Sequence, residues 1–149
     1  MTLPAAGYLE PFAEGIAQLI AAEDIAEWDS TGNYTADQVG TVIAVMPTEP
    51  DGIVSLTPYP ISDTLFTDDS VIALRVHLRG SADPRPVLQR NDQIFDLLQG
   101  LRGVEVGGAY VVVMWRQSSL LPVQDANQRW EISTVFYARV NWPSQHRPD

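Results

Sequence analysis

The sequence predicts an α+β fold, with a single mixed or antiparallel sheet of about five strands and two helices packed on one of its faces. Two segments place apolar residues three and four positions apart, and five others are β-branched or alternate apolar with polar residues. The expected element order is α-β-β-β-α-β-β. With 149 residues the chain has the length of one domain. Residues 1–142 should form that domain, and the polar, proline-rich residues 143–149 a flexible tail.

Both helices are expected from their apolar stripes and from residues that favour helix starts. The first should run from about Ala5 or Glu10 to about Glu23. Its stripe consists of Leu9, Phe12, Ile16, Leu19 and Ile20. The second should begin with Asp83 as N-cap and Pro84 at the first helical position.

The five strands are expected at residues 41–47, 53–61, 71–79, 108–117 and 129–142. The stretch "TEPDG" has turn chemistry, so the first two strands should form a hairpin, and Pro58 and Pro60 should stop the second. The fourth strand is nearly all apolar, which suits a central strand covered on both faces. The fifth exceeds the usual strand length, so its ends should project beyond the sheet. A right-handed crossover could join the third strand, through the second helix, to the fourth.

Charge is distributed unevenly along the chain, whose net charge is −10 and whose nine basic residues are all arginine. Residues 1–74 carry twelve acids and no Lys or Arg, a net charge of −12. Residues 75–149 carry nine arginines against seven acids, a net charge of +2. Direct binding of duplex DNA is therefore not expected, because phosphate contacts need clustered positive charge. The acidic half is either a solvated surface or one that repels passing DNA.

Several function classes are excluded by what the sequence lacks. The chain has no cysteine, so disulfides, thiolate catalysis and zinc–thiolate sites are excluded. The start, "MTLPAAGYLEPF", does not have the pattern of a signal peptide, and no apolar run has the length of a membrane span. We therefore expect a soluble protein with no export signal and no membrane partner.

No catalytic constellation stands out in the sequence. A small hydrolase using His77, Ser81 and Asp83 is one alternative, but the spacing gives no oriented triad. The turn "RGSADP" has one Gly and no Lys-Ser/Thr, so it is not a phosphate-binding loop. We expect no enzymatic activity, no cofactor and no metal.

The alternating strand 71–79 instead predicts an interaction surface. Its even residues from 72 to 78 are apolar and should face the core. Its odd residues, Arg75, His77 and Arg79, should line the other face and meet a partner or a neighbouring subunit. Arg129 and Arg139, on the last strand, are further candidates for that interface.

Three stretches resemble the tail terminator or minor capsid proteins of long-tailed bacteriophages. They are "IVSLTPYPISD", "VIALRVHLRGSADPRPVLQRNDQIFDLLQGL" and "SLLPVQDANQRWEISTVFYARVNWP". The apolar helix stripe in "YLEPFAEGIAQLIA" is also similar. Together these stretches cover most of the chain, in the order found in that family.

The resemblance implies a structural virion protein, located at the neck or tail top and in the host cytoplasm during assembly. Such a protein forms a homo-oligomeric ring, commonly a hexamer, that caps the tail tube and gives the head a docking surface. Its implied partners are the major tail tube protein and a head-completion or connector protein. DNA would pass through without specific binding, along an acidic lumen for which the candidates are Glu23, Asp24, Glu27 and Asp29. Another head–tail connector or a tail-tube component is the alternative within the same class.

Overall fold

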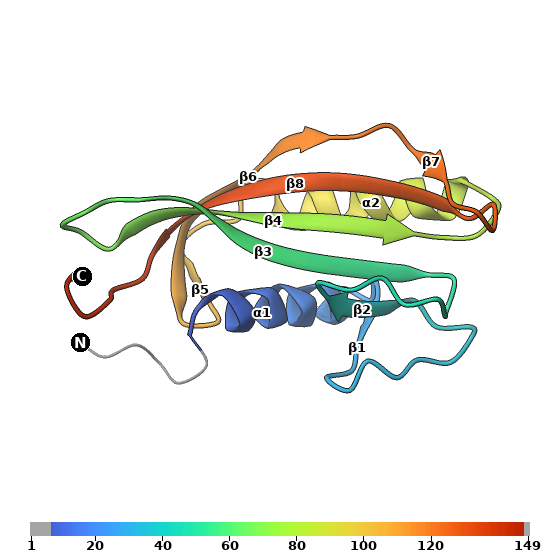
Figure 1. The fold of residues 1–149 in the computed structure, drawn as a ribbon, viewed down its shortest axis with the longest axis horizontal. Helices are drawn as coiled ribbons and strands as arrows, with labels where there is room; N and C mark the ends of the chain where they lie inside the picture. The colour runs from blue at the N-terminus through green and yellow to red at the C-terminus, as the bar shows by residue number, and fades with distance from the viewer. Residues whose placement is uncertain (1–6, 148–149) are drawn as a thin grey trace.

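A curled mixed sheet with two helices forms the centre of the fold in the computed structural model, which describes residues 7–147 (Figure 1). The helices are α1 (Leu9–Ala22) and α2 (Arg85–Leu98). The strands are β1 (Glu27–Trp28), β2 (Gly40–Ile43), β3 (Ile53–Asp63), β4 (Asp69–Arg79), β5 (Val104–Val106), β6 (Ala109–Ser119), β7 (Val123–Gln124) and β8 (Trp130–Asn141). The α+β class is confirmed.

The sheet has eight strands, not about five, and its spatial order is β1-β2-β3-β4-β8-β6-β5, with β7 also paired to β8. The five predicted strands correspond to β2, β3, β4, β6 and β8. The additional strands β1, β5 and β7 are only two or three residues long, too short for periodicity to reveal them. The element order is consequently α-β-β-β-β-α-β-β-β-β, which corrects the predicted one.

The predicted hairpin of β2 and β3 is wrong, because the two strands are parallel. Gly40 lies opposite Ile53 and Ile43 lies opposite Leu56, so the connection 44–52 returns along the whole length of the four-residue β2. The pairing of β1 with β2 is also parallel, and every other pairing in the sheet is antiparallel. The turn residues in "TEPDG" predicted a hairpin, but they show only that the chain bends there. They do not show the direction in which the chain enters the next strand.

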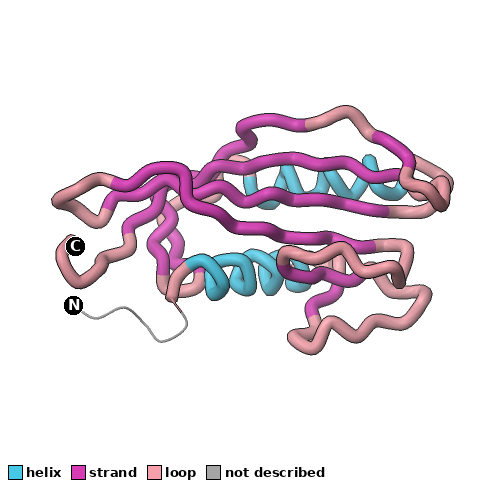
Figure 2. The backbone as a smooth tube through the Cα atoms, viewed as in Figure 1, coloured by secondary structure: helices cyan, strands magenta, loops and turns pink. Residues whose placement is uncertain are grey.

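The sequence predicts that Pro58 and Pro60 stop strand β3, but the strand continues through both prolines to Asp63. β2 pairs with β3 only up to Leu56, so beyond that point β3 has a neighbour on one side only. A strand with one unpaired edge tolerates proline, because a position whose N–H would face that edge has no ladder hydrogen bond to lose. A long β3–β4 hairpin results, and its tip extends at one end of the molecule (Figure 2).

The central strands β4 and β8 pair along almost their whole lengths, from Asp69 opposite Asn141 to Arg79 opposite Glu131. The ends of β8 thus do not project beyond the sheet as predicted. β6 lies between β8 and the short β5, close to one edge, and its last four residues are exposed. It is therefore not the central, doubly covered strand that its apolar sequence suggested.

β4 and β6 run parallel to each other with β8 inserted between them, since both are antiparallel to β8. Helix α2 connects them, so the crossover expected between the third and fourth predicted strands is present. In this sheet the two connected strands are not adjacent, because β8 lies between them. Its handedness stays a prediction.

The core lies between the helices and one face of the sheet. The buried residues of α1 and α2 belong to a single apolar cluster with the alternate residues of β4 and β8, so both helices cover the same face. On β4 the residues predicted for the core are no more than 1% exposed: Ile72, Leu74, Val76 and Leu78. Alternation therefore assigned the core face of this strand correctly.

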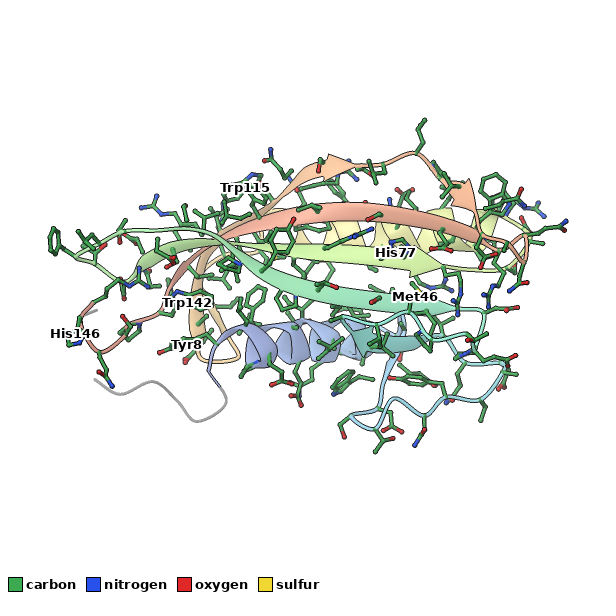
Figure 3. The ribbon with its side chains drawn as sticks, in the orientation of Figure 1. Tyr8, Met46, His77, Trp115, Trp142 and His146 are labelled. Carbon is green, nitrogen blue, oxygen red and sulfur yellow. The ribbon has the colours of Figure 1, made fainter. Side chains whose placement is uncertain are left out.

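The observed starts of both helices lie close to the predicted ones, and the start of α1 contacts the residue that follows β8. Helix α1 falls within its predicted bounds, and the alternative start at Ala5 lies outside the described residues. Just before α1, Tyr8 stacks on Trp142, just after β8, with ring centroids 5.1 Å apart (Figure 3). Helix α2 begins at Arg85, slightly later than predicted, and the Asp83 side chain accepts its backbone N–H at 3.1 Å.

The predicted tail contains a short bridge between Ser144 and Arg147. The Arg147 guanidinium donates to the carbonyl of Thr64 at 3.0 Å and to the hydroxyl of Ser70 at 3.0 Å. Residues 143–147 thus contact the β3–β4 hairpin, and residues 148–149 lie outside the described part of the chain. A flexible tail and a single domain over 1–142 stay predictions.

Candidate functional site

The face of the sheet opposite the helices is open, and a row of cross-strand neighbours with three aromatic side chains crosses it. Tyr59 on β3, Ala73 on β4, Tyr137 on β8 and Trp115 on β6 are successive cross-strand neighbours. The rings of Trp115 and Tyr137 meet edge to face with centroids 6.1 Å apart. Ala73 is fully buried although it lies on the open face, because its tyrosine neighbours flank it. Figure 3 shows Trp115 on the side of the sheet away from α1.

Arg75 and His77 lie beside this row and form a polar network with β8. The Arg75 Nε donates to the Ser133 hydroxyl at 2.9 Å, and the His77 Nε2 contacts the Glu131 carboxylate. An Arg75 terminal nitrogen lies 3.4 Å from the His77 Nδ1. With its proton on Nε2, the neutral imidazole would donate to Glu131 and accept from Arg75. The network holds both side chains on the open face, and Arg75 remains exposed.

Arg79, the third member of the predicted row, is only 2% exposed. Its Nε donates to the carbonyl of Asp51 at 3.0 Å and a terminal nitrogen to that of Pro50 at 2.7 Å. Because Arg79 is the last residue of β4, its side chain can curl into the neighbouring connection 44–52 instead of standing on the sheet. Burial first, and then the charge of Arg129, lower the pKa of Arg79 from its ordinary value. Within the subunit, Arg79 anchors a loop.

Arg129 anchors the same loop from β8's side. Its Nε donates to the Asp125 carboxylate at 2.8 Å, and a terminal nitrogen donates to the Thr48 carbonyl at 2.7 Å. Burial of Asp125 opposes ionisation, but hydrogen bonds from Arg129 and from the backbone of Asn127 outweigh it and lower the pKa of Asp125. We call Arg79 and Arg129, with the loop carbonyls that they bind, the arginine clasp. The clasp fixes the loop that makes β2 and β3 parallel.

Arg139 is the predicted interface residue that lies within β8, and it is accessible. Its side chain is 56% exposed, and its guanidinium lies 3.9 Å from the Asp69 carboxylate. An ion pair at that distance on the surface contributes little to stability. Arg75 and Arg139 are thus the two predicted interface arginines that remain accessible on the open face.

The four predicted acidic residues, Glu23, Asp24, Glu27 and Asp29, are all exposed and follow the end of α1. Three of them line a cavity of about 790 Å³ together with Asp37, and Arg90 of α2 lies on its wall. Hydrogen bonds from the Thr31 side chain and backbone lower the pKa of Asp29, and one from Thr35 does the same for Asp37. Both carboxylates therefore stay ionised at neutral pH, and the cavity rim is strongly negative.

The residues of the hydrolase alternative are not assembled. His77 is engaged with Glu131 and Arg75, whereas the Ser81 hydroxyl pairs with the backbone of Asp83. No hydrogen bond joins Ser81 to His77 in the described structure, so a nucleophile–base pair is not formed there. Residues 7–147 also contain no cluster of three or more metal-ligating side chains.

Two features were missed by sequence reasoning. Asp37 joins the acidic cavity from the connection between β1 and β2, and Arg90 joins it from α2, which is distant in sequence, and no local pattern predicts either. Exposed apolar side chains also stand on two connections: Leu65 and Phe66 between β3 and β4, and Leu120, Leu121 and Val123 between β6 and β8. Their signal was present in the sequence, since apolar residues within polar connections lack a core to enter.

Comparisons with known proteins agree with this architecture. The family model for the bacteriophage tail terminator protein matches residues 19–142. A chain from the structure titled "Virion of native gene transfer agent (GTA) particle" superimposes with a TM-score of 0.64 at 18% identity, covering 89% of this chain and 96% of that chain. At that identity the likeness shows a shared fold. No curated protein sequence matches the chain.

The fold and the family match define the class of protein as a structural component of a phage tail. The matched range spans most of the chain, from within α1 to the end of β8. The chain belongs to the bacteriophage tail terminator family. In the described residues no helix is long and apolar enough to cross a membrane.

Proposed function

We propose that this protein forms a closed homo-oligomeric ring, a hexamer, which caps the finished tail tube and presents the surface to which the head docks. The observation that carries the proposal is the tail terminator family match over residues 19–142. One ring face would bind the major tail tube protein, and the other a head-completion or connector protein. The protein would act at the neck or tail top of the virion, after assembly in the host cytoplasm.

The shape of the subunit supports a ring. A closed ring needs a heterologous contact, in which two different surfaces of each copy meet. The long axis of the molecule ends in the β3–β4 hairpin tip on one side and in the loops around the arginine clasp on the other (Figure 1). These two ends differ in shape and chemistry, so the subunit offers unlike surfaces to its neighbours.

We assign the lumen to the acidic surface after α1. Glu23, Asp24, Glu27 and Asp29, together with Asp37, form an exposed group of carboxylates with few cations nearby. Such a wall repels the DNA phosphates, so the DNA would slide through without specific binding.

The open sheet face supplies the partner contacts in this proposal. Arg75 and Arg139 would pair with a neighbouring subunit or ring, and His77 would hold Arg75 in place through the network with Glu131. Arg79 and Arg129 act behind this surface by shaping the loop 44–52. The mechanism is recognition of the last tube ring followed by presentation of a new face, and it contains no chemical step.

The mass of the purified protein in solution, combined with negative-stain imaging, tests the ring. We expect a discrete species with the mass of six subunits and a ring outline. Growth into tubes or filaments of undefined length would contradict the proposal and favour a tail-tube component, because a terminator stops at one ring.

Charge reversal tests the interface residues. Arg75→Glu and Arg139→Glu should each lower the fraction of ring, whereas Arg85→Glu should not, because Arg85 is exposed and paired locally with Asp83. Rings that form equally well in all three variants would rule out charge matching on the open face.

A further inference from the structure

The tip of the β3–β4 hairpin presents two large apolar side chains to solvent. Leu65 is 73% exposed and Phe66 is 78% exposed. The tip is nevertheless well structured, because the Thr64 hydroxyl donates to the Thr67 carbonyl at 3.0 Å and Arg147 donates to the Thr64 carbonyl at 3.0 Å. The backbone is thus fixed while the two apolar side chains remain largely exposed to solvent. An apolar group displayed in this way marks an interaction site.

A second apolar group stands on the segment that connects β6 to β8. Leu120 is 67% exposed, Leu121 is 84% exposed and Val123 is 58% exposed. The segment is held to the sheet at both ends, by the Leu120 N–H donating to the Ser133 carbonyl at 2.9 Å and by the pairing of Val123 with Glu131. It therefore also displays its side chains from a fixed backbone.

The two groups lie in opposite halves of the long axis of the subunit. In Figures 1 and 2 the hairpin tip forms one extreme of the molecule, and the connection between β6 and β7 lies above the other half of the sheet. One subunit cannot bring them together. A head-to-tail neighbour can, because a heterologous contact joins different surfaces of two identical copies.

Charge also favours contact between unlike groups. The hairpin tip carries Asp63, Asp68 and Asp69, and Arg147 and Arg139 lie 4.0 Å and 3.9 Å from Asp63 and Asp69, so one net negative charge remains there. Residues 106–124 contain no acid and one cation, Arg116, which stacks over the Phe95 ring of α2. Arg75 lies close to the second group as well, since its partner Ser133 also accepts the Leu120 N–H. Two hairpin tips packed on each other would bring together two groups that each carry a net negative charge, which is unfavourable.

We propose that the hairpin tip of one subunit packs against the β6–β7 segment of the next copy of this chain, with Leu65 and Phe66 covering Leu120, Leu121 and Val123. The contact forms between free copies in solution, and Arg75, which is exposed beside the second group, attracts the acidic tip. This inference rests on the proposed ring, because it names the surfaces through which the ring closes.

Engineered cysteines test the contact without interference, because the chain has none of its own. The variants are Phe66→Cys and Leu121→Cys, each purified separately, mixed, and oxidised under mild conditions. Both sites are exposed, so thermal unfolding of each variant should match that of the unchanged protein. In the mixture we expect at least about tenfold more disulfide-linked dimer than in either variant alone, because the contact holds the two thiols at high effective concentration.

A chain carrying both cysteines should give a ladder of linked species that ends at the size of the closed ring. The matched control combines Phe66→Cys with Val45→Cys, a site that is 57% exposed and belongs to neither group. This control should give no more linked dimer than the single variants.

Each other outcome overturns the proposed contact. Linkage in Phe66→Cys alone would show that the tips meet each other, and linkage in the Val45 control would show non-specific collision. A ring seen by mass in the same samples, without linkage in the mixture, would remove this contact and leave the proposed function standing. A monomer without linkage at every soluble concentration would also remove it, while tube capping would then test the proposed function separately.

Polar substitution provides an independent readout. Phe66→Ser combined with Leu65→Ser should lower the fraction of oligomer at least about tenfold at fixed concentration, because both apolar side chains are lost from the contact. Val45→Ser should leave the oligomer unchanged. An equal fraction of oligomer in the Leu65→Ser/Phe66→Ser variant and in Val45→Ser would overturn the proposal.

Discussion

The arginines of this protein have two different roles: some are exposed on the surface, and others are buried and bind the backbone. Arg75 and Arg139 reach solvent from the open sheet face, whereas Arg79 is buried and binds backbone carbonyls of the loop 44–52. Alternation along β4 placed Arg75 and Arg79 on the same face, and it could not show that the last residue of a strand turns into a neighbouring loop. Of these two β4 arginines, Arg79 therefore stabilises the fold, whereas Arg75 remains available on the surface.

The arginine clasp predicts a large stability effect at Arg79. Arg79→Met keeps much of the aliphatic stem but leaves the carbonyls of Pro50 and Asp51 without their donor. We expect a loss of about 2–3 kcal/mol in the free energy of unfolding, measured by urea denaturation. Arg85→Met is the control, since the Arg85 side chain is 79% exposed, and it should change stability by less than about 0.5 kcal/mol. Equal losses in both variants would exclude the clasp as a stabilising device.

Asp125 gives the clasp a dependence on pH. Its pKa is lowered on folding from the ordinary value of 3.8, so the ionised carboxylate stabilises the fold above that value. This contribution is lost as the pH falls below about 4, through the folded pKa. Asp125→Asn should therefore be less stable than the unchanged protein at pH 7. The gap between the two melting temperatures should narrow as the pH is lowered below about 4, and a constant gap would contradict this role.

At the scale of elements, the parts that could be predicted are those with a strong repeat. The apolar stripe of α1 and the core face of β4 follow directly from spacing, because each needs only the local chain. The parallel direction of β2 and β3, the continuation of β3 past Pro60 and the edge position of β6 depend on which strands become neighbours. Local sequence carries little information on such long-range pairing, so these features were missed.

The same limit applies to the candidate site. Arg75, Arg139 and the acidic residues from Glu23 to Asp29 were predicted as surface groups and are exposed. Arg90 and Asp37 could not be predicted to meet them, since three elements fold together to form that cavity.

The turn between β5 and β6 packs against the start of α1 and predicts a second effect on stability. At Gly107 an added Cβ would lie 2.2 Å from the backbone of Pro11. At Gly108, whose φ is also positive, the nearest atom is 3.8 Å away, in Tyr8. Both alanine variants share the cost of a left-handed backbone, so Gly107→Ala should be less stable than Gly108→Ala by about 1–3 kcal/mol. Thermal or urea unfolding measures the difference. Equal stabilities would show that the backbone at Pro11 can move away from the added Cβ at little cost.

At the scale of the whole molecule, charge separates the subunit into an acidic region and a more basic one. The acidic region carries the cavity rim of Asp24, Glu27 and Asp29, and the open sheet face carries Arg75 and Arg139. This separation suits the proposed ring, in which one surface would contact other proteins while another would face the passing DNA.

Reversing charge on the acidic surface should create affinity for DNA. We expect the chain carrying Asp24→Lys and Glu27→Lys to retain duplex DNA in a gel-shift assay at low salt and to release it as salt is raised. The unchanged protein should not retain DNA. A control with Asp92→Lys and Glu105→Lys reverses the same number of charges at exposed carboxylates outside that surface and should bind less DNA. Equal retention by the two variants would mean that net charge alone matters, and that the surface after α1 has no special place beside the DNA.

The capping of a growing tail tube tests the central proposal most directly. The measurement follows the length of tubes made by the purified tail tube protein of the same phage, by electron microscopy, with and without this chain. We predict that tubes stop growing when the chain is added and that each carries one ring at a single end. Tubes that grow to the same lengths without an end ring, or that incorporate the chain along their walls, would contradict the account.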